Sequence, residues 1–303
     1  MSALFGQSIH LTDGGLETTL IYHDGIDLPD FAAFTVLASE QGRAALAAYY
    51  EAYLTVAETR GLPIVLDTPT WRASSDWGAR LGYSVEQLAD VNRDSVAFLR
   101  EACAGRSVHI LVSGAIGPRG DGYVAGETMT TADACAYHAP QIEALAGAGV
   151  DLVSAITMTY AEEAAGIALA ATSAGVPVAV SFTVETDGTL PSGQALSDAV
   201  AEVDAETGRA PVHYMVNCAH PTHFSHVLVD SPAGRLRGVR VNASSKSHAE
   251  LDEATELDMG DPLQLAADVA GLRDRGADLT VFGGCCGTDH RHIDAFAAAL
   301  LPK

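Results

Sequence analysis

Three cysteines are placed so that two distant stretches of the chain could supply thiolates to one metal ion. Cys285 and Cys286 are adjacent and flanked by glycines, and Cys218 lies 67 positions before Cys285. Glycines would let the backbone turn sharply enough for both neighbouring side chains to face one ion. Three sulfur ligands suit Zn²⁺ and leave its fourth position open for a substrate, as in catalytic sites. The pattern therefore predicts a zinc centre, with a vicinal disulfide or two buried core cysteines as the alternatives for the pair.

The chemistry expected of such a centre is methyl transfer to a thiol. A substrate thiol in the open position loses its proton there and stays nucleophilic, because three thiolates make the complex electron-rich. Hydrolysis would need a more strongly Lewis-acidic metal. A protein of another class also fits the cysteines, one that binds zinc or senses redox state while they cycle between thiol and disulfide.

The rest of the chain alternates short apolar segments, typical of strands, with longer amphipathic or Ala-rich segments, typical of helices. The predicted strands are Ser8–Thr12, Ile64–Asp67, His109–Ser113, Asp151–Ala155, Pro177–Phe182, Val212–Val216, Gly238–Val241 and Leu279–Phe282. The predicted helices are Glu40–Arg60, Val85–Ala102, Ala132–Ala148, Ala161–Ala174, Ala195–Glu206, Thr222–Val229, Pro262–Arg275 and His290–Leu300.

Eight strand–helix pairs without hairpin signals predict a parallel sheet, and eight such units close into a (β/α)₈ barrel of the TIM type. An open doubly wound sheet is the alternative fold. We expect one catalytic domain over residues 1–303, because no linker-like or repeated segment interrupts the pattern. Active sites of such barrels lie at the C-terminal ends of the strands. Asp13-Gly14-Gly15, Asn217-Cys218 and Gly283–Gly287 all follow predicted strands, so they should meet on one rim.

The charge of the chain disfavours two classes of partner. It has 17 basic and 39 acidic residues, a formal net charge of −22, which repels nucleic-acid phosphates and anionic membrane surfaces. No apolar stretch reaches the ~20 residues that cross a bilayer, and the first residues lack the pattern of a secretory signal. Five cysteines without the spacing of a disulfide framework are typical of a reducing compartment. We therefore expect a cytoplasmic protein that acts on small molecules, and its oligomeric state, a homo-oligomer included, stays open.

Four motifs of this chain occur together in one known family. They are Asp13-Gly14-Gly15-Leu16-Glu17-Thr18, Gly114-Ala115-Ile116-Gly117-Pro118, Asn217-Cys218 and Gly283-Gly284-Cys285-Cys286-Gly287-Thr288. The last motif is highly specific and the others are moderately so, and together they resemble the homocysteine S-methyltransferase family from near residue 10 to near residue 295. The resemblance implies a zinc-bearing barrel that moves a methyl group to a thiol, usually homocysteine, which makes methionine. Donors across the family include sulfonium and ammonium compounds and corrinoid or folate systems.

The resemblance also implies roles for particular residues. The expected zinc ligands are Cys218, Cys285 and Cys286. Asp13 and the backbone of Gly14 and Gly15 would meet the amino-acid part of the substrate. Asn217 would shape the site beside the metal, and Thr157 is expected as a further substrate contact.

One position departs from the family pattern. Members usually carry a glutamate just after the fourth strand, where it binds the amino group of homocysteine, and here Ile156 aligns with that glutamate. A charge-assisted hydrogen bond of this kind is worth roughly 1.5–3 kcal/mol. The departure favours, as an alternative, a methyltransferase for a different small thiol or selenol, one without a free amino group.

Overall fold

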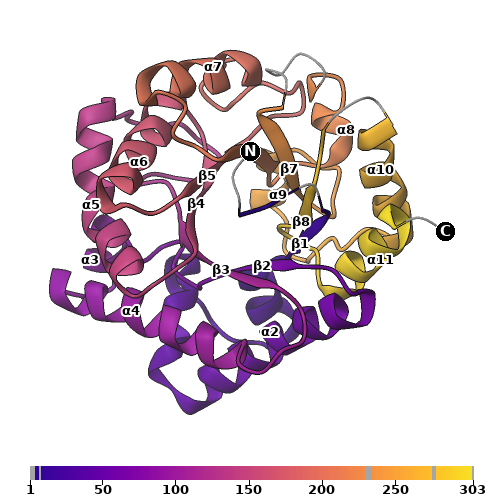
Figure 1. Cartoon of the computed structure of the whole chain (residues 1–303), viewed down its shortest axis with the longest axis horizontal. Helices are drawn as coiled ribbons and strands as arrows, with labels where there is room; N and C mark the ends of the chain where they lie inside the picture. The colour runs from indigo at the N-terminus through magenta and orange to yellow at the C-terminus, as the bar shows by residue number, and fades with distance from the viewer. Residues whose placement is uncertain (1–3, 7, 229–233, 275–277, 302–303) are drawn as a thin grey trace.

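The strands form one closed parallel barrel and follow one another around it in chain order (Figure 1). The computed structural model describes residues 4–6, 8–228, 234–274 and 278–301. The strands are β1 (His10–Thr12), β2 (Ile64–Asp67), β3 (Ile110–Ile116), β4 (Leu152–Met158), β5 (Val178–Thr183), β6 (His213–Asn217), β7 (Leu236–Val241) and β8 (Val281–Gly284). Because β1 pairs with both β2 and β8, the barrel is closed. The predicted (β/α)₈ barrel is confirmed, and the open doubly wound sheet was the wrong alternative.

Helices connect the strands and surround the barrel (Figure 1). They are α1 (Leu16–Thr18), α2 (Glu40–Arg60), α3 (Ser75–Arg80), α4 (Val85–Ala102), α5 (Thr131–Gly147), α6 (Ala161–Ala174), α7 (Leu196–Thr207), α8 (Pro221–Phe224), α9 (His248–Asp252), α10 (Pro262–Asp274) and α11 (His290–Leu300). The bounds predicted for α2, α4, α6 and α11 agree with the structure. None of the described helices has both the length and the apolarity needed to span a bilayer.

Local caps explain why these helix ends could be predicted. Ser84 begins α4 by accepting a hydrogen bond from the amide of Gln87. Gly61 ends α2 in the left-handed conformation, at φ 63°. Caps of both kinds provide partners for backbone groups that a helix end leaves unpaired, and the residue types that form them are visible in the sequence.

One predicted helix is shorter than expected. The helix expected over Thr222–Val229 ends at Phe224, and turns follow it. His226, in this turn, makes a contact of 3.0 Å between its Nε2 atom and the carbonyl oxygen of Asp187, so the segment follows a neighbouring loop instead of continuing a helical face. Val229, like Arg275 at the end of the helix predicted before the eighth strand, lies outside the described residues.

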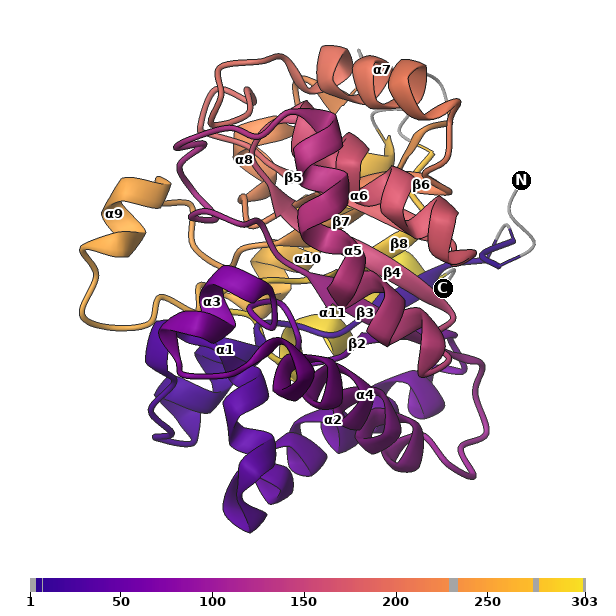
Figure 2. The same ribbon diagram turned by 90° about the vertical axis from the view of Figure 1, so that its left-hand side faces the viewer.

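The inside of the barrel is filled by side chains of its own strands and by Phe5, which precedes β1. Phe5 forms one buried cluster with Val65, Leu111, Leu152, Ile156, Ala179, Met215 and Val281. Phe5 packs edge-on against His213, at the start of β6, with ring centroids 4.6 Å apart, and lies 5.2 Å from the ring of His10. These three residues close the N-terminal end of the barrel, here called the floor. The opposite end, here called the rim, consists of the segments that follow the strands and includes α9, which Figure 2 places at the end away from the N-terminus.

Candidate metal centre and substrate pocket

The three cysteines predicted as metal ligands meet on the rim. Their sulfur atoms all lie within 4.8 Å of one another, and the Sγ atoms of Cys218 and Cys286 are 3.7 Å apart. In a tetrahedral site with Zn–S bonds of about 2.3 Å, neighbouring sulfurs lie roughly 3.8 Å apart. All three thiols, that of Cys285 included, are free, so the pair forms no vicinal disulfide. Among the residues that the structure describes, this is the one cluster of three or more His, Cys, Asp or Glu side chains that could hold a metal ion, and its donors and spacing fit zinc.

A strained turn places the thiol of Cys218. The residue has φ 55°, a left-handed conformation that costs a non-glycine residue about 1–2 kcal/mol. Its carbonyl oxygen accepts hydrogen bonds from Asn242 Nδ2 at 3.0 Å and His248 Nε2 at 2.9 Å, and its amide donates to the carbonyl of Arg240 at 3.1 Å. These three hydrogen bonds hold the backbone of Cys218 in the strained conformation, as is common for residues that direct a side chain into a functional site.

The glycines beside the cysteine pair act mainly by leaving room. Gly283 and Gly284 are the last residues of β8, and a Cβ atom on either would overlap the side chain of Thr12 or Thr288. Gly287 alone of the flanking glycines is left-handed, at φ 78°. The expectation that these glycines serve a sharp turn therefore holds for one of them, and the other two allow the strand to approach its neighbours closely.

The loop after β1 packs backbone to backbone against the cysteine loop. A Cβ atom on Gly15 would lie 2.6 Å from the carbonyl oxygen of Cys285, and the amide of Gly15 donates to the carbonyl of Thr288 at 3.1 Å. A Cβ atom on Gly14 would lie 2.5 Å from the hydroxyl of Tyr53. Both glycines, predicted as substrate contacts, therefore stand directly beside the candidate metal centre.

Asn217 and Thr157, also predicted as substrate contacts, bind each other. The Asn217 Oδ1 atom accepts hydrogen bonds from the Thr157 amide at 3.0 Å and from Ser181 Oγ at 2.7 Å. Its Nδ2 atom donates to Thr157 Oγ1 at 2.8 Å and lies 3.9 Å from the sulfur of Cys285. Thr157 is left-handed, at φ 67°, and lines the pocket. Asn217 thus holds the end of β4 in a strained conformation beside the cysteines.

A buried arginine links the first two strands to the seventh. Arg240 of β7 donates to Asp13 at 2.5 Å and also forms an ion pair with Asp67. Burial raises the pKa of Asp13 to about 7, and the charge of Arg240 opposes this rise. Burial also lowers the pKa of Arg240, but Asp67 and Asp13 more than reverse that effect. Asp13, predicted to meet the substrate, is therefore already paired with a cation inside the protein.

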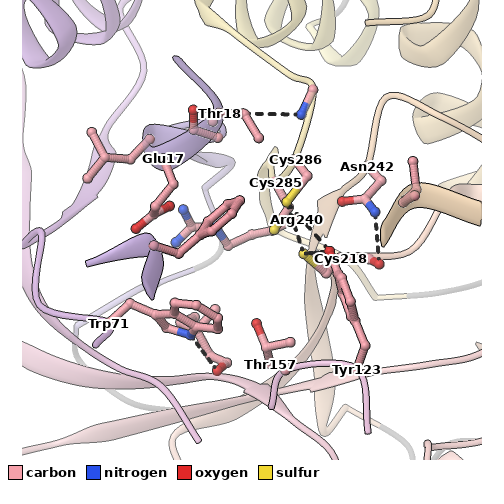
Figure 3. A pocket seen from close by; sticks show the side chains of 18 of the residues that line it. Glu17, Thr18, Trp71, Tyr123, Thr157, Cys218, Arg240, Asn242, Cys285 and Cys286 are labelled. Atoms are coloured by element: carbon pink, nitrogen blue, oxygen red, sulfur yellow. Dashed lines mark hydrogen bonds between the residues drawn. The ribbon is translucent and has the colours of Figure 1, made fainter. Parts of the chain in front are cut away.

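A cavity of about 400 Å³ lies beside the cysteines (Figure 3). Its wall at β4 is formed by the aliphatic side chain of Ile156, which is 8% exposed, and by the indole of Trp71. Trp71 Nε1 donates a hydrogen bond to the carbonyl oxygen of Ile156 at 3.1 Å. The guanidinium of Arg72 is stacked between the rings of Trp71 and Trp77, 3.9 and 3.8 Å from their centroids. The pocket is large enough for a small ligand and joins a polar metal corner to an apolar wall.

A tyrosine hydroxyl points at the cysteines from the loop between β3 and α5. The Tyr123 hydroxyl lies 3.7 Å from the sulfur atoms of both Cys218 and Cys286, as Figure 3 shows. The Tyr123 ring stacks on His248, with centroids 4.1 Å apart and planes 15° apart. Burial, and then the charges of the cysteines, raise the pKa of Tyr123 well above its ordinary value. The hydroxyl therefore stays protonated and can donate to a thiolate.

Sequence reasoning missed several residues of this site. Arg240 carried a signal, because an arginine inside the apolar strand Leu236–Val241 has to find buried counter-charges. Tyr123 and His248 carried none, since they come from rim segments without periodic patterns. Glu17 was seen as part of a motif, but no role was assigned to it.

The barrel, its rim pocket and the three converging thiols define an enzyme of the TIM-barrel class with a candidate metal centre. A family model described as homocysteine S-methyltransferase matches residues 10–300. The chain belongs to this family and is therefore a methyltransferase, as its four motifs predicted.

Solved structures of one bacterial enzyme resemble the chain over nearly its whole length. The homocysteine methyltransferase MmuM from Escherichia coli in its oxidized form is 23% identical, with a TM-score of 0.78 and 96% of both chains covered. Its metallated form is 24% identical, with a TM-score of 0.76 and 97% of this chain and 96% of that chain covered. At these identities the likeness supports the fold. A search of curated proteins gives no match.

Proposed function

We propose that this chain is a zinc-dependent S-methyltransferase that moves a methyl group from a sulfonium or ammonium donor to a small thiol. The first candidate for this thiol is homocysteine. The observation that carries the proposal is the convergence of three free thiols within 4.8 Å, beside a cavity of about 400 Å³. Three protein ligands leave a tetrahedral ion one position for a substrate sulfur.

Cys218, Cys285 and Cys286 would hold the ion. When bound, zinc supplies the positive charge that keeps an acceptor thiol deprotonated near neutral pH. Cys218 in particular needs such a charge, because hydrogen bonds with Cys285 and Cys286, followed by burial, raise the pKa of its thiol well above the ordinary value. Three thiolates side by side in a buried corner are otherwise unfavourable.

The proposed reaction is an in-line displacement. The acceptor sulfur forms a new S–CH₃ bond while the CH₃–S⁺ or CH₃–N⁺ bond of the donor breaks. The electron pair of that bond stays on the donor sulfur or nitrogen, which becomes neutral, and the thiol proton goes to solvent. The chain contributes mainly by positioning. Gly14, Gly15 and Thr157 line the pocket together with the cysteines, and the Tyr123 hydroxyl is placed to donate to sulfur.

The finer features of the proposal rest on separate observations. Homocysteine is the acceptor in the description of the family, while Ile156 keeps another thiol or selenol as the second candidate. A protein that only binds zinc or senses redox state would have no need of the pocket beside the thiols. The five cysteines are free, which favours a reducing compartment, and we propose the cytoplasm. One catalytic domain over residues 1–303 remains part of the proposal.

Replacement of Cys218 by alanine tests the proposal. We expect bound zinc, measured by mass spectrometry, to fall from about one ion per chain to near zero, because a two-thiolate site is incomplete. Methyl transfer from S-methylmethionine to homocysteine should be lost with it. Cys103→Ala, at a half-buried cysteine of the α4 end, is the matched control and should keep both. Full turnover by a zinc-free Cys218→Ala protein would refute the proposal.

A further inference from the structure

Among the described residues that line the pocket, one carboxylate, that of Glu17, is left without an ion pair or a hydrogen bond to another residue. Glu17 belongs to α1, two residues beyond Gly15, on the loop that packs against the cysteine loop. In Figure 3 its side chain stands on the same side of the cavity as Trp71, across from Tyr123 and Cys218. Within the described part of the chain, its carboxylate makes no ion pair and no hydrogen bond with another residue.

The other carboxylates around the pocket are either paired or exposed. Asp13 and Asp67 share Arg240, and Asp258 accepts a hydrogen bond from Ser244 at 2.7 Å. The remaining carboxylates that line the cavity are exposed: Asp30, Asp121, Asp252 and Glu256. Among the described lining residues, Glu17 is therefore the partly buried carboxylate that forms no ion pair and no hydrogen bond with another residue.

The basic residues nearest the pocket are also engaged elsewhere. Arg72 is held between two indole rings and donates to the carbonyl of Gly120 at 2.9 Å. Arg240 is taken by its two aspartates. The β4 wall offers Ile156, which cannot bind a cation. A substrate cation that enters this pocket would therefore find its buried counter-charge at Glu17.

We propose that Glu17 binds the ammonium group of an amino-acid acceptor, so that the pocket accepts aminothiols although β4 carries Ile156. The inference rests on the proposed function, because it takes the acceptor sulfur to be held beside Cys218, Cys285 and Cys286. An ammonium at one end of the acceptor and a thiol at the other would then bridge the loop after β1 and the metal centre. Glu17, in the segment after β1, would then take over the role of the glutamate that family members usually carry after the fourth strand.

The electrostatics of Glu17 support this geometry. Burial and, after it, the charge of Cys285 raise the pKa of Glu17 to about 7, against the opposing charges of Arg240 and Arg72. A carboxylate in such surroundings gains more from an incoming cation than an exposed one does, because water competes less for it. The four exposed carboxylates of the rim would give much smaller gains.

Equilibrium binding of the acceptor alone tests the role of Glu17. Isothermal titration of the zinc-loaded protein should give homocysteine an advantage over its deaminated analogue, 4-mercaptobutanoate, on the order of 10- to 100-fold. In Glu17→Gln most of this advantage should disappear, while 4-mercaptobutanoate binds within about twofold of its original affinity. Glu17→Asp, which keeps the charge, should retain part of the advantage. Asp30→Asn, at an exposed lining carboxylate, is the matched control and should change neither affinity.

Each other outcome has a separate meaning. Retention of the homocysteine advantage in Glu17→Gln would overturn the assignment, and so would a wild-type protein that binds both thiols equally. A loss confined to binding of S-methylmethionine would also overturn it, because Glu17 would then serve the donor. If neither thiol binds the zinc-loaded wild type, the proposed function itself has failed, and the Glu17 variants play no part in that result.

Discussion

The rim and the floor of the barrel are built from the same strands, but their polar groups differ. At the rim, Cys218 and Thr157 are held left-handed. Glu17 forms no ion pair or hydrogen bond with any other described residue. At the floor, His213 is 3% exposed and packs against Phe5 in an apolar cluster. The rim therefore presents polar groups to a pocket that can hold a ligand, whereas the floor packs its histidine against apolar side chains. Function and stability are separated along the barrel axis, as is general for this fold.

The seventh strand shows the contrast within a few residues. Arg235, directly before β7, pairs with Asp204 at 2.6 Å and donates to the carbonyl of Pro211 at 2.8 Å. Arg240, in the last part of the same strand, pairs with two aspartates beside the pocket. Both arginines are buried. One serves the structure of the floor end and the other also shapes the substrate site.

The largest expected effect comes from removal of these two arginines. Among the described residues, Arg240→Met leaves Asp13 and Asp67 buried without an ion-pair partner. Arg235→Met removes the nearest counter-charge of Asp204, which keeps Arg209 at 4.0 Å. Each variant should lose about 3–5 kcal/mol of unfolding free energy, measured by urea denaturation. Only Arg240→Met should also weaken binding of homocysteine to the folded, zinc-loaded protein. Equal weakening of binding in both variants would break the comparison between rim and floor.

The floor predicts a pH dependence of stability. Burial, followed by the charges of Arg237 and Arg235, lowers the pKa of His213 from 6.5 to about 3. Below pH 6.5 the unfolded chain therefore binds a proton that the folded chain does not, so stability falls as the pH falls. At pH 5 this residue should cost about 2 kcal/mol relative to pH 7.5.

His213→Gln provides the comparison for that effect. Urea denaturation at pH 7.5 and pH 5 should give a smaller loss of unfolding free energy for the variant than for the wild type, since the other titrating groups are shared. Equal losses in both proteins would show that His213 is not kept neutral by burial. Zinc content should not differ between the two proteins, because the floor lies at the other end of the barrel.

The smallest predicted effect is at the Tyr123 hydroxyl. Tyr123→Phe removes the donor to Cys218 and Cys286 and keeps a ring to stack on His248. One lost hydrogen bond should lower kcat/KM for methyl transfer by about 2- to 10-fold, with bound zinc unchanged. An unaltered kcat/KM would mean that the hydroxyl plays no part in tuning the sulfur atoms.

The metal side of the site could be predicted from the sequence, and the reason is local chemistry. The residue types were sufficient to predict metal ligands: two adjacent cysteines, Cys285 and Cys286, stand between glycines, and Cys218 stands at the end of another strand. The helix bounds at Glu40–Arg60 and Val85–Ala102 were predicted correctly, and in the structure Ser39 and Ser84 cap their first turns while Gly61 ends the first of them. Once eight strands were assigned, closure of the barrel brought these segments together.

The opposite side of the pocket depends on geometry that no local pattern contains. The link from Arg240 to Asp13 and Asp67 requires the seventh strand to face the first two across the closed barrel. Glu17 lies in a helix of three residues, too short for a periodic signal. Tyr123 reaches the cysteines from a loop between β3 and α5 and stacks there on His248, which follows β7. Such contacts appear only in three dimensions.

X-ray absorption at the zinc edge tests the central claim most directly. The zinc-loaded protein should show three sulfur atoms at about 2.3 Å and one lighter ligand, and addition of homocysteine should replace the lighter ligand by a fourth sulfur. This result would place Cys218, Cys285, Cys286 and the acceptor on one ion. A first shell dominated by nitrogen or oxygen, or a sulfur count that does not change when the thiol is added, would contradict the account.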